Sequence, residues 1–160
     1  MADELPAPLY TVEGVYPVPV EVLWTAWTDA AELERWYSPT DLSVTPGSAV
    51  SDARPGGRWA IGVDVPAHGF TAWFWGRYTE VVPHRRLVHT LSYSQDRADY
   101  DAHDDDAPAH VIVVDFEERG AESLVRFAQI GEMPAEQVEA TRAGMQSYFD
   151  SLQRHLAASA

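Results

Sequence analysis

The stretch 134–156 constrains the fold most, because it is the only long amphipathic helical pattern in the chain. Apolar residues recur there at steps of three and four, which places them on one face of an α-helix. Pro134 suits the first turn, where its missing N–H is not needed. A helix of roughly 22 residues would be about 33 Å long, enough to cross a whole sheet. The apolar stripe must be buried against the preceding strands, and it consists of Val138, Thr141, Met145, Tyr148, Phe149, Leu152 and Leu156.

Gly144 interrupts this run of helix-forming residues. A glycine inside a helix lowers its stability by about 1 kcal/mol relative to alanine, so its presence needs a reason. One reason is close contact between the helix backbone and a strand, which is the interpretation we favour from the sequence. The other reason is space left beside the helix for a bound molecule.

Composition narrows the chemistry. The chain has 160 residues, enough for one domain that buries about 70% of its unfolded surface. It contains no cysteine, which excludes disulfides, thiol nucleophiles and thiolate metal sites. All 11 basic residues are arginines, and the absence of lysine excludes a Walker-type phosphate loop, a Schiff base and a lysine base. The formal charge of −14 repels nucleic acid and anionic membranes, so we expect neither as a partner.

The N-terminal residues 1–9 contain two acids, two prolines and no apolar core. We expect a disordered segment there, which is neither a signal peptide nor a membrane anchor. No apolar run approaches the ~20 residues of a membrane span. Because the sequence also shows no internal repeat and no linker, we expect one domain over residues 10–157 in a cytoplasmic protein.

The first third of the chain indicates one strand followed by two short helices. Residues 10–16 alternate as a strand does, and two prolines then end it. Residues 20–28 have an apolar helical face. Asp29 begins a capping-box pattern with Glu32, which predicts a second helix that ends before Pro39.

The middle of the chain indicates strands only. Residues 58–65 alternate so that every second side chain is apolar, which is typical of a half-buried strand. Residues 94–108 are dense in aspartate and predict a polar, mobile loop. The last two strands form a hairpin through residues 118–120. The predicted strands are 42–46, 58–65, 70–82, 87–93, 111–117 and 123–130.

Strands joined by short turns pair in the antiparallel direction. We therefore predict the α+β class, with one curved antiparallel sheet of about seven strands and a long C-terminal helix across it. The two short helices after the first strand would close one end of the sheet.

Five stretches, in this order, resemble the START-like (SRPBCC) superfamily, and within it the domains related to the C-terminal half of activators of the heat-shock protein 90 ATPase. No single motif is decisive, but the series is fairly specific and covers roughly residues 10–156. The stretches are PVEVLWTAWTD (19–29), LERWYSP (33–39), RPGGRW (54–59), GRYTEVVPHRRLV (76–88) and GMQSYFDSL (144–152).

The resemblance implies a helix-grip fold, in which the sheet wraps around the C-terminal helix and leaves a cavity that often holds an apolar ligand. Two departures bear on that cavity. Members often have Gly-Trp where this chain has Gly144-Met145, and the acidic loop 94–108 is longer than expected. The identity of a ligand therefore stays open, since one fold hosts many activities.

Aromatic residues are the first candidates for lining such a cavity. Their rings are large and apolar, and a flexible methionine can adapt between them. A cavity lined by rings and a few polar groups is how proteins hold small apolar molecules. The alternative for each ring is an ordinary place in the core. The candidates are Trp36, Trp59, Trp73, Trp75, Tyr78, Phe116, Phe127, Met145, Tyr148 and Phe149.

Polar residues on the same strand faces come next. His89 and Gln129 could orient a polar atom of a ligand or donate a proton. For His89 we favour the alternative, a hydrogen-bonded histidine of the core or of a sheet edge. Arginines at 58, 77 and 126 could pair with a carboxylate, although strand arginines more often face solvent. We assign no catalytic residue.

Metal and cofactor sites have little support. His103 and His110 flank the acidic run Asp104–Asp106, but the spacing of an EF-hand loop or a His-Glu-x-x-His helix is absent. We interpret the run as a solvated charged segment and expect no metal. The sequence has no nucleophile elbow and no dinucleotide fingerprint, so we expect neither a serine hydrolase nor a bound cofactor.

Three functions remain. The first is a binding protein that holds a small hydrophobic or aromatic molecule in the cavity, and it leads because it demands least of particular residues. The second is a cyclase or dehydratase acting on an aromatic or polyketide-like substrate, with His89, Tyr78 or Arg77 as proton-transfer or enolate-stabilising groups. The third is regulation of the heat-shock protein 90 chaperone, which rests on the resemblance alone. The oligomeric state, a homodimer included, is left open.

Overall fold

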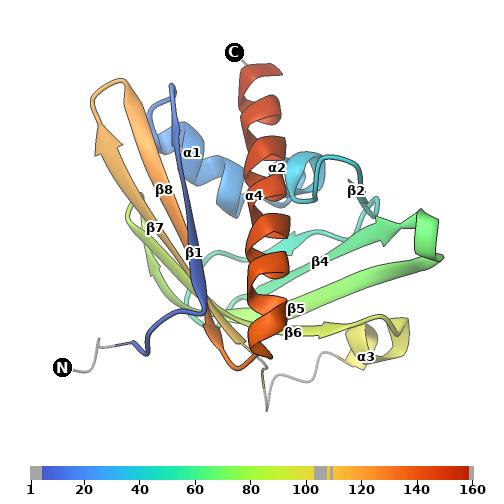
Figure 1. The fold of residues 1–160 in the computed structure, drawn as a ribbon. Helices are drawn as coiled ribbons and strands as arrows, with labels where there is room; N and C mark the ends of the chain where they lie inside the picture. The colour runs from blue at the N-terminus through green and yellow to red at the C-terminus, as the bar shows by residue number, and fades with distance from the viewer. Residues whose placement is uncertain (1–4, 103–107, 109, 159–160) are drawn as a thin grey trace.

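We describe the fold from a computed structural model of the chain, in which residues 5–102, 108 and 110–158 are described. Figure 1 shows the order of the elements along the chain. The helices are α1 (Val20–Thr28), α2 (Ala30–Trp36), the short 3₁₀ turn η1 (Pro66–His68), α3 (Arg97–Ala102) and α4 (Ala135–Ala158). The strands are β1 (Tyr10–Tyr16), β2 (Ser43–Val44), β3 (Val50–Ser51), β4 (Arg58–Val65), β5 (Phe70–Val82), β6 (Arg86–Ser94), β7 (His110–Arg119) and β8 (Glu122–Gly131).

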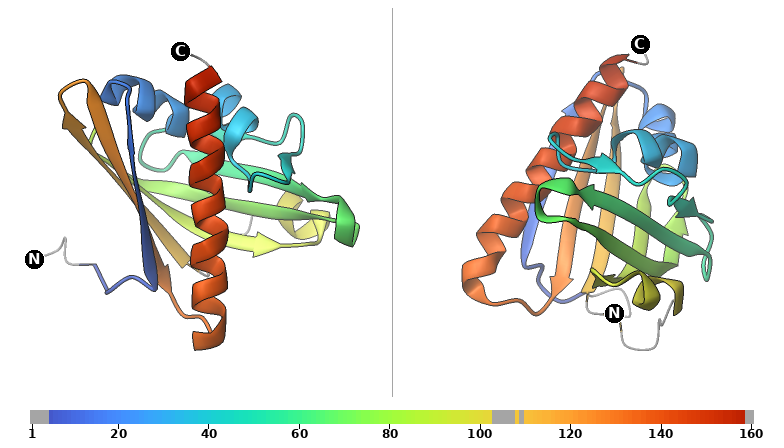
Figure 2. Two further views of the ribbon diagram at one scale, coloured as in Figure 1. Left: turned by 45° about the horizontal axis from the view of Figure 1, so that its top comes forward. Right: turned by 90° about the vertical axis from the view of Figure 1, so that its right-hand side faces the viewer.

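All pairs in the sheet are antiparallel, as expected from the short connections between the strands. The order is β1-β8-β7-β6-β5-β4-β2, with β3 also paired to β4. The first strand therefore returns to pair with the last, and Tyr10 lies opposite Gln129. The sheet curls around α4, while α1 and α2 lie at the end where α4 finishes (Figures 1 and 2). The predicted α+β helix-grip architecture is confirmed.

Asp29 both ends α1 and begins α2. Its backbone N–H donates to the carbonyl of Thr25, and its side chain accepts from the N–H of Ala31 at 3.1 Å. The reciprocal half of the predicted capping box does not form. Glu32 instead accepts from Nε2 of His155 in α4, at 2.7 Å, so this carboxylate ties α2 to the C-terminal helix.

The predicted stripe on α4 is the face that meets the sheet and the two short helices. Met145, Phe149, Leu152 and Leu156 are buried, and the remaining three stripe residues are half-buried. The C-terminal half of the stripe packs in an aromatic core together with residues of α1 and α2. The apolar stripe of α4 is therefore fully packed against other residues toward the C-terminal end of the helix and only partly packed toward its N-terminal end.

The expectation of a half-buried strand at residues 58–65 is wrong, because β4 is buried on both faces over Trp59–Val63. One face meets the main core. The other carries Ala60 in a second apolar cluster with Trp73 and Trp75, which Tyr100 of α3 covers. Residues 97–102, expected in a polar loop, thus form a short helix that shields the outer face of the sheet.

Two further differences are local. Strand β3 was not predicted, because two residues are too short to show alternation. The hairpin between β7 and β8 turns at Gly120-Ala121, slightly later than predicted, where Gly120 has the positive φ of 69° that such a turn favours. Residues 1–4 of the predicted N-terminal segment and residues 103–107 of the predicted loop lie outside the described residues.

Candidate functional site

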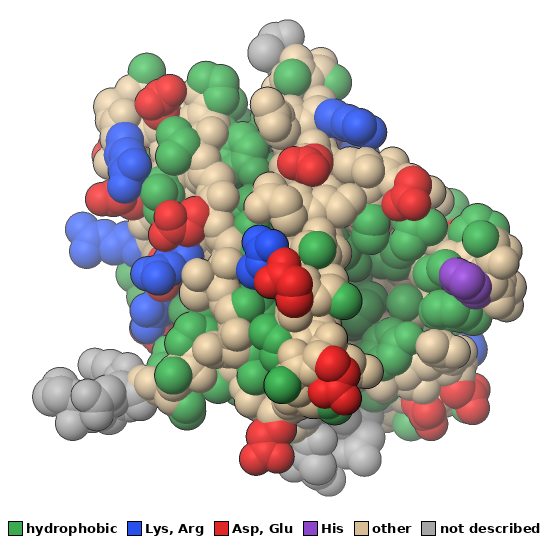
Figure 3. All heavy atoms as spheres, in the orientation of Figure 1, with side chains coloured by type: hydrophobic (Ala, Val, Ile, Leu, Met, Phe, Trp, Pro, Cys, Tyr) green, Lys and Arg blue, Asp and Glu red, His purple; other side chains and the backbone are tan. Residues whose placement is uncertain are grey.

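A cavity of about 270 Å³ lies between the sheet and the N-terminal half of α4. It adjoins a second hollow, which shares part of its lining and reaches the exposed ring of Tyr93. Figure 3 shows apolar side chains gathered in the hollow beside α4. The cavity is lined by Tyr10, Tyr37, Trp59, Phe74, Leu91, Ile112, Phe127, Gln129, Thr141, Gly144, Met145 and Tyr148.

Gly144 is the point at which α4 stands away from the sheet. A Cβ atom built on Gly144 would meet no atom within 4 Å. Close contact between the helix and a strand, the interpretation favoured from the sequence, is therefore wrong. The space that the alternative interpretation required is present, since Gly144 belongs to the cavity lining.

The structure brings five of the eleven predicted site residues together around this cavity. They come from three different parts of the fold, namely β4, β8 and α4, and converge because the sheet curls around the helix. Whether these side chains bind a ligand stays a prediction. They are Trp59, Phe127, Gln129, Met145 and Tyr148.

Three other predicted residues belong to the buried core and do not line this cavity. Trp36 donates from Nε1 to the carbonyl of Ala26 at 2.8 Å and packs edge-on against Trp27. Phe149 packs against the same indole, with ring centroids 5.9 Å apart. Phe116 contacts Trp24 and Trp27. Periodicity placed these rings on inward faces correctly, but it could not tell a core ring from a cavity ring.

The remaining three lie elsewhere. Trp75 is on the outer face of the sheet, as is Trp73, and both pack with Tyr100 of α3. The hydroxyl of Tyr78 is 2.8 Å from Oγ of Ser51 and does not reach the cavity. His89 stacks on the ring of Trp59 and lies outside the lining. We therefore assign none of these three to the cavity.

The lining also includes residues that sequence reasoning missed. Leu91, Ile112 and Thr141 had a signal, since each shares a predicted inward face with a candidate. Phe74 lies in a strand that is apolar on both faces, so alternation could not orient it. Tyr37 follows the last residue of α2, and its position depends on where that helix ends. Apart from Gly144, for which the sequence suggested such space, the residues missed are Tyr10, Tyr37, Phe74, Leu91, Ile112 and Thr141.

One end of the cavity carries a hydrogen-bonded chain of polar groups. The hydroxyl of Tyr10 donates to Oε1 of Gln129 at 2.5 Å. The amide nitrogen of Gln129 lies 3.1 Å from Nδ1 of His110, and Nε2 of His110 lies 3.1 Å from the carbonyl of Glu132. With Nδ1 accepting and Nε2 donating, every link has a donor and an acceptor. The chain fixes the Gln129 amide at the cavity wall.

Among the described residues, none of those that line the cavity has a charged side chain. Burial raises the pKa of Tyr10, Tyr37 and Tyr148 far above the ordinary value for a phenol, and neighbouring tyrosines make a smaller contribution in the same direction. All three phenols are therefore neutral at physiological pH. The cavity presents rings, three hydroxyls of tyrosine, one amide and the hydroxyl of Thr141, and it can hold an uncharged molecule without burying an unpaired charge.

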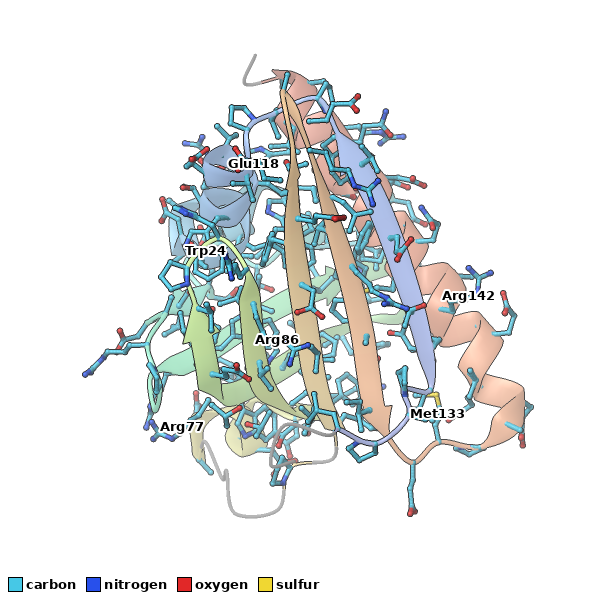
Figure 4. The ribbon with its side chains drawn as sticks, turned by 90° about the vertical axis from the view of Figure 1, so that its left-hand side faces the viewer. Trp24, Arg77, Arg86, Glu118, Met133 and Arg142 are labelled. Atoms are coloured by element: carbon cyan, nitrogen blue, oxygen red, sulfur yellow. The ribbon has the colours of Figure 1, made fainter. Side chains whose placement is uncertain are left out.

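The arginines considered for carboxylate binding do not enter the cavity lining. Arg77 donates to the carbonyl of Gly56, and Arg126 pairs across strands with Glu13. Figure 4 shows Arg77, Arg86 and Arg142 around the outside of the molecule. His103 and the aspartates at 104–106 lie outside the described residues. Among the residues that are described, no cluster of three or more potential metal ligands occurs.

A curved antiparallel sheet that grips a long C-terminal helix, with two short helices after the first strand, defines a helix-grip protein. The chain matches the sequence profile of the Activator of Hsp90 ATPase homolog 1-like protein family over residues 17–157 and belongs to that family. None of the curated proteins matches it significantly.

Solved structures share the fold at low sequence identity. A protein from Silicibacter pomeroyi described as AHSA1 has a TM-score of 0.78 at 20% identity, with 94% of this chain and 99% of that chain covered. A protein from Staphylococcus epidermidis has a TM-score of 0.76 at 20% identity, covering 100% and 96%. A protein from Chromobacterium violaceum has a TM-score of 0.74 at 23% identity, covering 91% and 94%.

None of the helices among the described residues combines the length and the apolar character that crossing a membrane requires.

Proposed function

We propose that this protein binds a small hydrophobic or aromatic molecule in the cavity between the sheet and α4. The observation that carries the proposal is Gly144, which lies inside a long helix with open space where its side chain would be. Alanine would fit there and would favour the helix by about 1 kcal/mol. The glycine therefore gives up helix stability and enlarges the cavity.

The size and lining of the cavity support the same function. Its volume of about 270 Å³ is close to the lower end of small-molecule sites, roughly 300 Å³. An engineered apolar cavity of about 150 Å³ holds one benzene ring, so this one has room for about two fused rings. Aromatic walls with a few fixed polar groups are typical of such sites.

The test is a thermal-shift measurement with 2-ethylnaphthalene as the probe. Binding to the folded chain should raise Tm in proportion to ln(1 + [L]/Kd). Gly144→Leu fills the cavity from the helix and should abolish the shift, while its far-UV circular dichroism stays that of the folded protein. Ala143→Leu is the matched control, because Ala143 is exposed on the same helix turn. The proposal fails if Gly144→Leu keeps the full shift.

The two other functions are less well supported. His89, Tyr78 and Arg77 do not line the cavity. None of the three residues suggested as proton-transfer or enolate-stabilising groups is therefore placed to act on a molecule bound there. The family description refers to the Hsp90 ATPase, but nothing in the described part of the chain favours that role over ligand binding. Addition of the protein to an Hsp90 ATPase assay would test it directly. A cytoplasmic location stays a prediction, and the oligomeric state stays open.

A further inference from the structure

We infer, on the basis of the proposed function, that the ligand is uncharged and carries a hydrogen-bond acceptor such as a ring carbonyl, which takes hydrogen bonds from Tyr37 and Tyr148. The cavity has more donors than its own acceptors satisfy. The excess of hydrogen-bond donors indicates that the ligand supplies an acceptor.

Most buried tyrosine hydroxyls in this fold have a partner. Tyr10 donates to Gln129, Tyr16 donates to the carbonyl of Phe149, and Tyr78 is bonded to Ser51. The hydroxyls of Tyr37 and Tyr148 have none among the described residues, although Tyr37 is only 6% exposed. Neither hydroxyl is sealed off by protein atoms, and both residues line the cavity. Buried polar groups are normally hydrogen-bonded, so these two are available to a bound molecule.

The two phenols belong to one wall of the cavity. The ring of Tyr37 lies edge-on to that of Tyr148 with centroids 5.1 Å apart, and edge-on to Trp59 with centroids 5.7 Å apart. Tyr37 is held at the end of α2 by the hydrogen bond from its N–H to the carbonyl of Leu33 and by packing against Trp27 and Trp36. The donors are therefore in place before a ligand arrives, which lowers the entropic cost of binding.

Charge excludes ionic ligands. A carboxylate inside the cavity would find no cationic side chain in the lining, and the chain as a whole carries a formal charge of −14. A cation would be attracted from a distance and by the aromatic rings, but it would find no carboxylate there to offset its lost hydration. Burial keeps the phenols protonated by raising the pKa of Tyr37 and Tyr148, so both remain donors.

The experiment compares four probes with one naphthalene frame by titration calorimetry at neutral pH. They are 2-acetylnaphthalene, 2-ethylnaphthalene, 2-naphthoate and 2-naphthylmethylammonium, which place a carbonyl, a hydrocarbon, an anion and a cation at the same position. We expect the ketone to bind about tenfold more tightly than the hydrocarbon and the two ions to bind more weakly than either. One good hydrogen bond in a water-excluded site accounts for a factor of that size.

Variants assign the effect to the two phenols. Tyr37→Phe and Tyr148→Phe should each weaken the binding of 2-acetylnaphthalene severalfold and leave the affinity for 2-ethylnaphthalene unchanged. Tyr16→Phe is the control, because its hydroxyl is bonded to the backbone of Phe149 outside the cavity. Equal affinity of the ketone and the hydrocarbon, or tightest binding of either ion, would overturn the inference while leaving ligand binding intact. Failure of all four probes to bind the wild-type protein would count against the proposed function itself.

Discussion

The imidazole of His89 stacks on the indole of Trp59, with ring centroids 4.2 Å apart and 22° between the ring planes. Nδ1 of His89 lies 2.8 Å from the carbonyl of Thr90, to which the neutral ring donates. Burial lowers the pKa of His89 from 6.5 to about 4, and the bond to Thr90 opposes this only in part. The histidine is thus a neutral ring that supports one wall of the cavity.

This pKa predicts a loss of stability in mild acid. Between pH 6.5 and 4 the unfolded chain binds a proton at His89 and the folded chain does not, so the free energy of unfolding falls as pH falls through this window. The contribution is roughly 3 kcal/mol. Urea unfolding of the wild type and of His89→Phe at pH 7 and pH 4 should show a smaller loss in the variant. His68→Phe, at an exposed position, is the control and should behave as wild type; equal pH dependence in all three would contradict the assignment.

Substitution by alanine should change the free energy of unfolding in opposite directions at two glycines, Gly144 and Gly76. Gly144→Ala meets open space and should raise the free energy of unfolding by up to about 1 kcal/mol. Gly76→Ala would place its Cβ 1.9 Å from the carbonyl oxygen of Thr90 in the paired strand, and should lower it by about 2 kcal/mol or more. Chemical denaturation of both variants measures the difference. A destabilised Gly144→Ala protein would contradict the open space beside the helix at this position.

The two adjacent indoles of the core should differ in their tolerance of phenylalanine. Nε1 of Trp36 donates to Ala26, whereas Nε1 of Trp27 is buried without a hydrogen-bond partner among the described residues. Both changes to phenylalanine remove a similar volume, but only Trp36→Phe also removes a satisfied hydrogen bond. We expect Trp36→Phe to be the more destabilising by about 1 kcal/mol in thermal or urea unfolding. The opposite order would mean that the N–H of Trp27 has a partner, such as a buried water.

Much of the fold was predictable because its signals are local. The stripe on residues 134–156, the strand at 10–16 and the helix at 20–28 repeat with the period of their element, and residues 70–82 form a long run of aromatic and apolar residues between two turn signals. Strand β3 has no such repeat. Helix α3 was missed because its residues are mostly polar and only Tyr100 is buried, so its position depends on tryptophans of a distant strand.

The candidate site was less predictable than the fold. Parity along a strand tells which ring points inward, but both Phe116 and Phe127 point inward and only the second lines the cavity. The difference depends on where α1, α2 and α4 fill the space inside the curled sheet. Gly144 illustrates the same limit, since the sequence marked it as unusual and suggested the wrong reason first.

The sequence by itself determined the class of fold, the long gripped helix and the absence of thiol and lysine chemistry, because composition and periodicity are properties of each segment alone. The tertiary structure decided which inward rings became core and which became cavity wall, and it left the hydroxyls of Tyr37 and Tyr148 without a hydrogen-bond partner among the described residues. Those outcomes depend on distances between segments remote in the chain, and no local pattern contains them.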